Sequence, residues 1–589
     1  MAVDMVGKNL TRPIQLADQV AKFSEEAEIS KQECNELKSK TEALATLLRQ
    51  AARASDLYEK PTIRILQEID QVLDKALSFV SKCRDRGLIT RVFTIVPAAT
   101  FKKLCAQLDN SIADVTWLLA VSKQSNGNND DEDDFGLPPI VSNDPMVGFI
   151  WNLIAKLQLG NLAEKTEGVT SLESCANGND RQKDIIVEEG GVPPLLKLLK
   201  EGGIDGQENA AKTLGLLGTD PKRVEVMVHA GVCSVFAKVL KEGSTKLQGL
   251  VAWAVSVIVE HDLKSQDIFA QNNSVRLLVG HLAHETLEEH RKYMVFTKPT
   301  TMIGVVNDAL NSPQENKDGL GGNVSLVQAA VLKGKVSEDK NNKAYLKAMS
   351  ARALWHLTKD NPTICKIITE SKALLCLAVL LEKGTGDVQI NSAMALMEIA
   401  RVAEKDSELR CSAFKPSSPA AKSVVEKLLN VVEKGEYNDL LIPCINALGC
   451  LARAFRASEK RIITPLVNLL DDREDEVMAA ASIALSKYAC TENYLHHDHS
   501  RAIIDARGVK LLVQLALFGC EEVKVPSLVL LCYITLYVPE SEVLVQEGVR
   551  SVLEGAAKQG LMMYDNAIQF LLDKARSRLE LYQSRSQRN

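Results

Sequence analysis

A short apolar segment that recurs along most of the chain is the feature that most constrains its fold. In GGVPPLLKLLKEG at Gly190–Gly202, a glycine-containing turn precedes a leucine-rich stretch, and an alanine-rich stretch follows. Equivalent apolar positions fall at Leu195, Val235, Leu277, Cys376, Leu428, Leu466, Leu512 and Val552. Most of them are about 40 residues apart, and this period is typical of arrays of helical repeats. The sequence therefore predicts stacked helices, each unit burying its apolar face against its neighbours.

Each repeat is expected to contain a short helix followed by two longer antiparallel helices. The last of these, the third helix, is predicted at Asn209–Leu217, Leu250–Val259, Ser350–Leu357, Ser392–Ala400, Ile445–Ala452, Ala479–Tyr488 and Leu528–Leu536. Helical repeats of this length are typical of armadillo and HEAT proteins. We expect an all-α fold in which a right-handed armadillo-repeat solenoid of about nine units occupies residues 144–589. The 99-residue gap between Leu277 and Cys376 predicts a disordered insertion near residues 284–343, and a short helix at Ser325–Leu332 is an open alternative within it.

Residues 1–123 have a different pattern, with four long amphipathic stretches and no repeat. These stretches are Ile14–Glu28, Lys31–Tyr58, Thr62–Cys83 and Ala98–Val121, and they predict a four-helix bundle. An acidic linker at residues 124–143 contains five consecutive acids, Asp130–Asp134. This composition suggests that the bundle moves freely relative to the repeats.

Composition limits the cellular setting. A net charge of −6 gives no reason to expect nucleic-acid binding. The 13 cysteines lie mostly in apolar stretches, as expected of reduced core residues. The longest apolar stretch, Val525–Val538, is too short to cross a bilayer. We expect a cytoplasmic protein, with the plasma-membrane periphery and a nuclear pool as further locations.

No sequence motif supports catalysis, so we predict no enzyme activity and no catalytic, cofactor or metal site. Phosphate-binding loops, nucleophile elbows and dinucleotide fingerprints are all missing. The densest group of metal-ligand types is Cys490, His496, His497 and His499. Its spacing fits no common zinc pattern, and a polar loop is favoured over a metalloenzyme site.

Basic residues gather on the later third helices and predict a partner groove. They are Arg352, His356, Lys359, Arg401, Arg453, Arg456 and Lys487. A positive groove favours an acidic or phosphorylated protein segment. The alternative, a solvated charged face without a partner, is equally compatible with the sequence.

A second basic group lies in the bundle at Lys82, Arg84, Arg86, Arg91, Lys102 and Lys103. It flanks the apolar Val92–Val96, and such a combination suits peripheral contact with an anionic membrane. In the alternative, the apolar segment belongs to the bundle core and the cations are ordinary surface residues.

Three segments together resemble the plant armadillo-repeat-only family. They are KNLTRPIQLADQVAKFSEEA, RVFTIVPAATFKKL, and IIVEEGGVPPLLKLLKEG with the following QENAAKTLGLLG. The resemblance covers nearly the whole chain. It implies a scaffold without catalysis that works with Rho-type plant small GTPases and their regulators in polarised cell growth. Plant U-box ligases are similar in layout, but residues 124–143 leave no room for a U-box.

The alternative function is a nuclear transport or transcription-associated adaptor. Armadillo proteins that bind nuclear localisation signals repeat a tryptophan and, four residues later, an asparagine on their third helices. Here Trp253 is followed by Val257, and the equivalent positions read Leu216, His356, Glu398, Cys450, Lys487 and Tyr533. The asparagine ladder is missing, which argues against this function.

Overall fold

The computed structural model describes residues 2–54, 57–84, 98–123, 137–283, 326–435, 438–454, 461–559 and 566–586. These residues form helices and connecting turns, and no strand occurs among them, so the predicted all-α class is confirmed. The chain divides into two compact units, Met1–Val235 and Phe236–Asn589, called unit 1 and unit 2 below. This division falls between residues 235 and 236, so it does not test the domain boundaries expected at residues 123 and 144, which stay predictions.

Four helices form the N-terminal part of unit 1. They are α1 (Ala2–Glu25), α2 (Lys31–Ala51), α3 (Glu59–Arg84) and α5 (Ala98–Lys123). Both α1 and α5 pack against α2 and α3, as in a four-helix bundle. On α2, Leu37, Leu44 and Leu48 are buried in the bundle core. Helix α2 ends at Ala51, earlier than expected.

The bundle is docked on the N-terminal end of the repeat array. This differs from the free movement that the acidic linker suggested. Tyr58, between α2 and α3, donates a hydrogen bond to the Glu189 backbone carbonyl (2.7 Å). The Trp151 indole nitrogen donates to the Glu189 carboxylate (2.7 Å). The rings of Trp117 and Trp151 lie 5.9 Å apart. Asp114 accepts a hydrogen bond from the Ile140 amide (2.9 Å). We call these contacts the bundle–repeat junction.

The repeat array follows the predicted order of three helices per unit, except that the described residues contain no first helix before α25. A helix pair, α6 (Pro145–Leu159) and α7 (Leu162–Gly178), precedes the repeats. The first helices are α8 (Asp180–Glu188), α11 (Pro221–His229), α14 (Ser265–Gln271), α19 (Pro362–Glu370), α22 (Ser407–Ala413), α27 (His496–Asp505) and α30 (Glu542–Gln546). The second helices are α9 (Val192–Glu201), α12 (Val232–Glu242), α15 (Ser274–Ala283), α20 (Ala373–Lys383), α23 (Pro419–Lys434), α25 (Ile463–Asn468), which continues into η4 (Leu469–Asp471), α28 (Gly508–Phe518) and α31 (Val549–Gln559).

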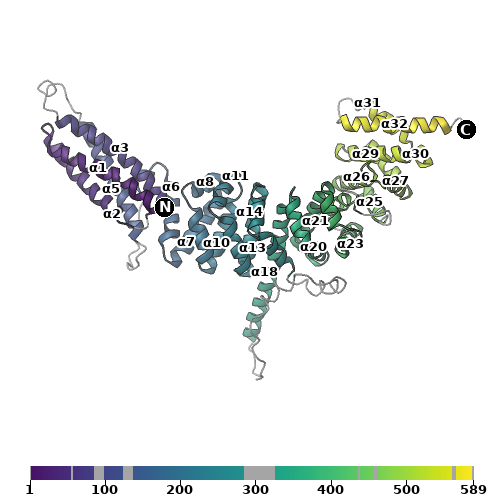
Figure 1. Ribbon diagram of the computed structural model, residues 1–589, viewed down its shortest axis with the longest axis horizontal. Helices are drawn as coiled ribbons and strands as arrows, with labels where there is room; N and C mark the ends of the chain where they lie inside the picture. Colours follow the sequence, from purple (N-terminus) through teal and green to yellow (C-terminus); the bar gives the residue numbers. More distant parts are fainter. Residues whose placement is uncertain are drawn as a thin grey trace. The chain divides into compact units, whose positions relative to one another are not determined.

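The third helices are α10 (Ile204–Leu217), α13 (Thr245–His261), α18 (Leu326–Thr358), α21 (Asp387–Lys405), α24 (Asn438–Cys450), α26 (Asp475–Ala489), α29 (Glu521–Tyr537) and α32 (Asn566–Ser586). Every third helix predicted from the sequence lies within one of these, apart from two residues at the end of α24. In unit 2, α13, α18, α21, α24, α26, α29 and α32 pack in this order, each against the next (Figure 1). The third helices of unit 2 therefore form one continuous layer.

Two turns recur in the repeats and explain their common geometry. Between first and second helices, a residue with positive φ occurs at Gly190, Gly231, Asn273, Lys372, Arg507 and Gly548. Between second and third helices, a glycine in extended conformation ends the helix at Gly202, Gly384 and Gly519. A Cβ there would lie 2.4–2.6 Å from the backbone carbonyl four residues earlier. Only glycine permits so sharp a turn without displacement of the backbone.

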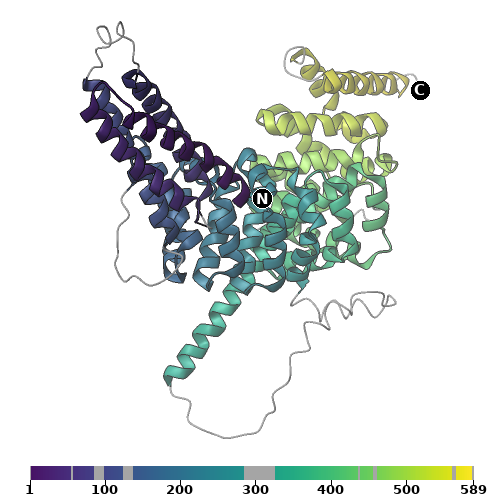
Figure 2. The ribbon, with the colours of Figure 1, turned by 60° about the vertical axis from the view of Figure 1, so that its left-hand side comes forward.

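The insertion differs in part from the prediction. Helix α18 begins at Leu326, so it contains most of the short helix considered at Ser325–Leu332, and residues 333–343 are helical where a loop was expected. Both ribbon views show the N-terminal part of α18 extending beyond the stacked repeats (Figures 1 and 2). The remainder of the expected insertion, residues 284–325, lies outside the described residues, as does the acidic run of the linker.

Candidate functional site

The predicted groove residues lie on or next to consecutive third helices of unit 2. We call the surface formed by α13, α18, α21, α24, α26 and α29 the third-helix face. Arg352 and His356 belong to α18, and Lys359 follows its end. Arg401 belongs to α21 and Lys487 to α26, while Arg453 lies in the turn after α24. Arg456 lies outside the described residues.

The first cluster joins α13 and α18. The Arg352 guanidinium lies 3.3 Å from the Glu260 carboxylate, and His356 Nε2 lies 3.8 Å from the same oxygen. His356 is buried, and burial lowers its pKa to about 4. His356 is therefore neutral at pH 7, and Arg352 is the cation paired with Glu260 among the described residues.

The second cluster lies on α21 and the turn before α19. Arg401 Nε lies 2.9 Å from the Glu398 carboxylate, and its Nη2 lies 3.0 Å from Asp360. This hydrogen bond from Arg401 lowers the pKa of Asp360. Lys405 is 3.7 Å from Asp360. Because Glu398 is only 4% exposed, Arg401 neutralises an otherwise uncompensated buried carboxylate and has a structural role.

The third cluster spans three helices. Lys487 Nζ, on α26, lies 2.6 Å from a Glu404 carboxylate oxygen on α21 and 3.1 Å from Cys450 Sγ on α24. Burial raises the pKa of Cys450 to about 11, so its thiol is neutral. A close contact makes the span possible, because a Cβ on Gly449 would lie 2.8 Å from Ala484 Cα. Helices α24 and α26 therefore pack closely enough for Lys487 to reach past α24.

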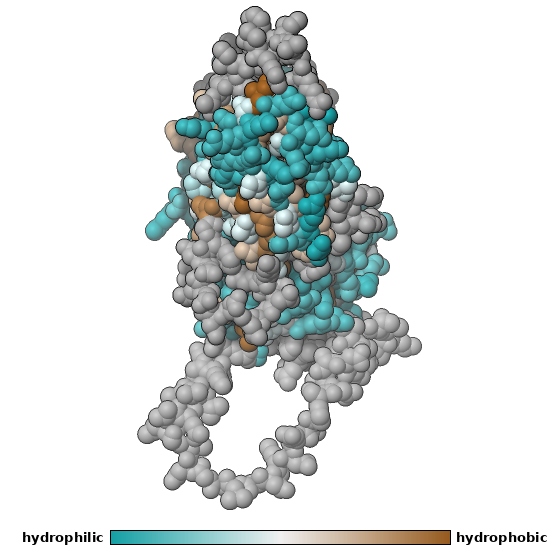
Figure 3. Space-filling view, turned by 90° about the vertical axis from the view of Figure 1, so that its left-hand side faces the viewer, coloured by the Kyte–Doolittle hydropathy of each residue, from teal (hydrophilic) through white to brown (hydrophobic). Residues whose placement is uncertain are grey.

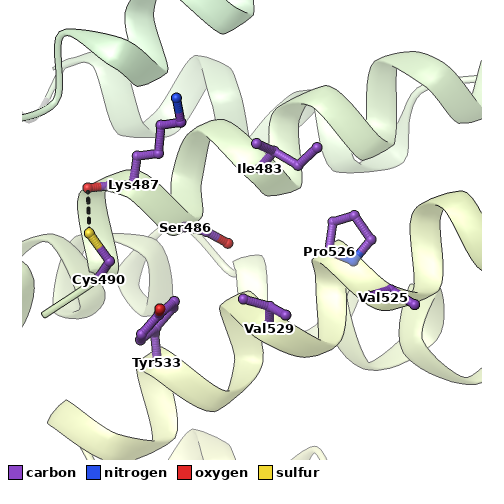
Figure 4. Close-up of a pocket in the computed structure, with 8 residues that line it drawn as sticks. All are labelled: Ile483, Ser486, Lys487, Cys490, Val525, Pro526, Val529 and Tyr533. Carbon is purple, nitrogen blue, oxygen red and sulfur yellow. Dashed lines mark hydrogen bonds between the residues drawn. The ribbon is translucent and has the colours of Figure 1, made fainter. Parts of the chain in front are cut away.

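Beside Lys487, the third-helix face opens into an apolar pocket between α26 and α29. Its volume is about 340 Å³. It is lined by Ile483, Ser486, Lys487, Cys490, Val525, Pro526, Val529 and Tyr533 (Figure 4). In the close-up, the Lys487 amine points away from the pocket, so only its aliphatic stem contributes to the wall. The pocket is thus an apolar site with a cationic rim.

The predicted cations do not form a bare positive groove. Arg352, Arg401 and Lys487 each have a carboxylate partner from the same chain. Lys359 is exposed, and no ion pair of its ammonium is among those of the described residues. Partly exposed ion pairs contribute little net free energy, about 0–1 kcal/mol. The carboxylates that pair with Arg352 and Lys487 are partly exposed, whereas Arg401 is tied to the buried Glu398.

The described members of the basic bundle group are exposed at the ends of α3 and α5. They are Lys82, Arg84, Lys102 and Lys103, whereas Arg86 and Arg91 lie outside the described residues, as does the apolar Val92–Val96. Arg84 is 2.8 Å from Glu26 and stacks over Phe23 at 4.4 Å. The described side chains seen in Figure 3 are mostly hydrophilic. Among the described residues, no helix has the length and apolar character needed to cross a membrane.

The residues of the histidine-rich group have separate partners. His496 packs against Tyr537, with ring centres 3.9 Å apart, and its Nδ1 lies 2.6 Å from the Asn493 carbonyl. His499 is buried against Tyr488. In the described part of the chain, no three His, Cys, Asp or Glu side chains converge as a metal site would require. The expected polar loop is also shorter than predicted, because α27 begins at His496.

Sequence reasoning missed the carboxylates and the pocket. Glu404 and Asp360 carry no local signal, since each meets its cation only through the stacking of helices. The pocket left a weak signal. Lys487 and Tyr533 occupy the registered asparagine positions, and the apolar Ile483 and Val529 stand four residues before them.

Two family models match the chain. A domain of unknown function (DUF7792) matches residues 7–123, the four helices of the bundle. The armadillo/beta-catenin-like repeat matches residues 179–218, which contain α8, α9 and α10. These three helices are an armadillo repeat, and the same order of helices and turns continues along the array. The chain thus has the fold of an armadillo-repeat solenoid. Neither family model is described as an enzyme family.

Solved structures share the helical architecture at low identity. An engineered protein matches at 22% identity with a TM-score of 0.47, covering 73% of this chain and 99% of its own. A designed armadillo-repeat protein in complex with a (KR)4 peptide matches at 14% identity and a TM-score of 0.35, covering 57% and 98%. Among curated proteins, no sequence matches.

Proposed function

We propose that this protein is a non-enzymatic scaffold that holds an acidic or phosphorylated segment of a signalling protein along the third-helix face of unit 2. The observation that carries this proposal is the row of exchangeable ion pairs beside an open apolar pocket on one continuous helical layer. A dianionic phosphate competes better than a carboxylate for Arg352, because it adds charge and accepts two parallel hydrogen bonds from a guanidinium.

The kind of signalling protein follows from the resemblance to the plant armadillo-repeat-only family. We take the partners to be Rho-type small GTPases or their regulators, acting in polarised growth in the cytoplasm near the plasma membrane. The exposed Lys82, Lys102 and Lys103 support peripheral contact with an anionic leaflet, at about 1 kcal/mol per cation.

A capture experiment with nucleotide-locked Rho-type GTPases tests the proposal. The variant Arg352→Met with Lys487→Met removes two cations of the third-helix face. The control, Lys366→Met with Lys427→Met, removes two lysines from ion pairs of 2.6 Å on a first and a second helix. Capture should fall at least tenfold for the first pair and stay unchanged for the control. Equal capture by the two variants would show that the third-helix face is not the binding surface.

Membrane contact is tested separately by sedimentation of the full chain with vesicles of phosphatidylcholine, with and without phosphatidylserine. The variant Lys102→Ser with Lys103→Ser should sediment less than the natural chain with the anionic vesicles alone. Sedimentation that does not depend on phosphatidylserine would rule out the electrostatic contact.

A further inference from the structure

The pocket between α26 and α29 is built from two matching stripes of side chains. Ile483, Ser486, Lys487 and Cys490 stand at positions i, i+3, i+4 and i+7 of α26 and its cap. On α29, Val525, Val529 and Tyr533 stand four residues apart, with Pro526 beside them. The side chains of each stripe lie on the part of the helix surface that faces both the other helix and solvent. The pocket is therefore a product of helix packing and does not depend on a loop.

The size and chemistry of the pocket define what it can hold. Its volume of about 340 Å³ is at the lower end for small-molecule sites, which span about 300–1,000 Å³. The wall is aliphatic and aromatic, and Ile483 is 45% exposed despite its apolar side chain. A single bulky apolar side chain fits both the volume and the wall, and it would cover Ile483.

Helix α29 also lacks one of its own backbone hydrogen bonds at the pocket residue Pro526. Pro526 lies inside α29 and has no N–H, so the Glu522 carbonyl cannot receive the α-helical hydrogen bond that residue 526 would otherwise donate. A partner in extended conformation presents backbone N–H groups that need acceptors. An extended segment is thus a better occupant than a helix, whose N–H groups are already bonded.

The cationic rim already carries a carboxylate. Lys487 Nζ contacts Cys450 on α24 and is bound to Glu404 from α21. The Glu404 carboxylate is thus an internal example of the group that Lys487 binds. Both side chains are partly exposed, at 30% for Lys487 and 19% for Glu404. An incoming acidic side chain can therefore take the place of Glu404.

We infer that the pocket holds one bulky apolar side chain of an extended partner segment, while an acidic side chain of that segment replaces Glu404 on Lys487. This inference rests on the proposed function and specifies the partner's chemistry. Packed helices are about 8–10 Å apart and an extended chain advances about 3.3 Å per residue, so the acidic residue lies about three residues from the apolar one.

A labelled peptide of eleven residues provides the probe. It carries one phenylalanine and a glutamate three residues away on each side, in a serine, glycine and alanine background. With a glutamate on both sides, one of them can reach Lys487 whichever way the peptide runs across the helices. Binding to the full-length protein is measured by fluorescence anisotropy. Replacing the phenylalanine by serine should weaken binding at least tenfold. Replacing both glutamates by glutamine should weaken binding about two- to fivefold.

Two protein variants examine the pocket wall and a control surface. Val529→Asp places a charge in the pocket and should weaken binding of the phenylalanine peptide at least tenfold. Leu517→Asp changes an apolar side chain that is 52% exposed on α28, away from the pocket, and should leave binding unchanged. Equal affinities for these two variants would overturn the inference.

The distinctive test is Glu404→Gln, which removes the internal competitor. It should tighten binding of the glutamate peptide about two- to fivefold and leave the glutamine peptide unaffected. Tightening of both peptides, or of neither, would contradict the exchange on Lys487. Melting curves of each variant confirm that the fold is retained.

The outcomes separate this inference from the proposed function. If Arg352→Met with Lys487→Met abolishes GTPase capture while Val529→Asp leaves both capture and peptide binding intact, the scaffold function stands and the pocket assignment fails. If Val529→Asp lowers the molecular mass measured by sedimentation equilibrium, a second copy of the chain occupies the pocket and the inference is again wrong.

Discussion

The bundle–repeat junction and the third-helix face use similar side chains for opposite purposes. At the junction, Trp151 is fully buried and its indole nitrogen is bonded to Glu189. On the third-helix face, the apolar residues Ile483 and Val529 line an open pocket. Lys487 pairs there with the Glu404 carboxylate, and both side chains are partly exposed to solvent. The junction has its partners within the chain, whereas the face leaves part of its apolar and charged surface for another molecule.

The two regions differ in whether their side chains have all their partners within the chain, and not in the types of side chain they contain. A buried aromatic group with a satisfied donor stabilises the fold and offers nothing to a ligand. An apolar wall in water and an ion pair near the surface can both gain from a partner. The two regions should therefore respond in opposite ways to substitution, with losses of stability at the junction and losses of binding on the face.

The largest expected effect is that of Trp151→Ala. Truncation of a fully buried tryptophan costs about 3–5 kcal/mol and leaves Glu189 without its indole donor. Denaturant unfolding and proteolysis of unit 1 measure the loss. The matched control is Trp253→Ala on the third-helix face, where the ring is only partly buried and the cost should be about 1 kcal/mol or less. Equal costs would remove the distinction between the two regions.

The second prediction uses pH. Burial raises the pKa of Asp114 from 3.8 to about 6 at the junction. Between pH 4 and pH 6 the folded chain keeps a proton that the unfolded chain has released, so the free energy of unfolding falls as pH rises. Burial lowers the pKa of His356 from 6.5 to about 4, so its contribution falls as pH drops through that range. Each effect is limited to about 3 kcal/mol.

Single variants separate the two contributions. The difference in melting temperature between the natural chain and Asp114→Asn should shrink toward pH 4, and that for His356→Gln should shrink toward pH 7. Burial has the largest effect on the pKa of His356. Glu260 raises this pKa, whereas Arg352, Lys359 and His261 lower it further. Slopes of the same sign for both variants would contradict this account.

The repeat architecture could be predicted because its determinants are local. The apolar period and the alanine-rich stretches placed every predicted third helix inside an observed one, apart from two residues at the end of α24. The turn between first and second helices was harder to recognise, because Lys372 and Arg507 adopt the positive φ that Gly190 and Gly231 have elsewhere. Helix α2 was predicted too long, since nothing local marks Tyr58 as a junction residue.

The arrangement of the site could be predicted only in part. The cations were located because side chains on third helices share a register. Their carboxylate partners were not, because Lys487 and Glu404 are 83 residues apart and meet only where Gly449 allows α24 and α26 to approach closely. The junction has the same origin, since Tyr58 and Glu189 are separated by 131 residues.

The third prediction concerns this close approach. Gly449→Ala places a methyl group 2.8 Å from Ala484 Cα, so α24 and α26 must separate, at a cost of about 1–3 kcal/mol. Separation also lengthens the reach of Lys487 to Glu404. The control is Gly555→Ala in α31, where nothing lies within 4 Å of the added Cβ. That change should stabilise the protein by about 0.5–1 kcal/mol.

The smallest effect on stability is expected for Arg352→Met. Its guanidinium is 31% exposed and pairs with Glu260 alone among carboxylates of the described residues, so its loss should change the unfolding free energy by no more than about 1 kcal/mol. Arg223 in α11 is the matched comparison, because its buried side chain pairs with Asp184 (2.6 Å) and donates to the Leu217 carbonyl (3.0 Å). Arg223→Met leaves a buried acceptor unsatisfied and should cost about 1–3 kcal/mol without changing partner capture. Calorimetry and capture on the same two variants should therefore rank them in opposite orders, and a shared order would mean that Arg352 serves the fold and not a partner.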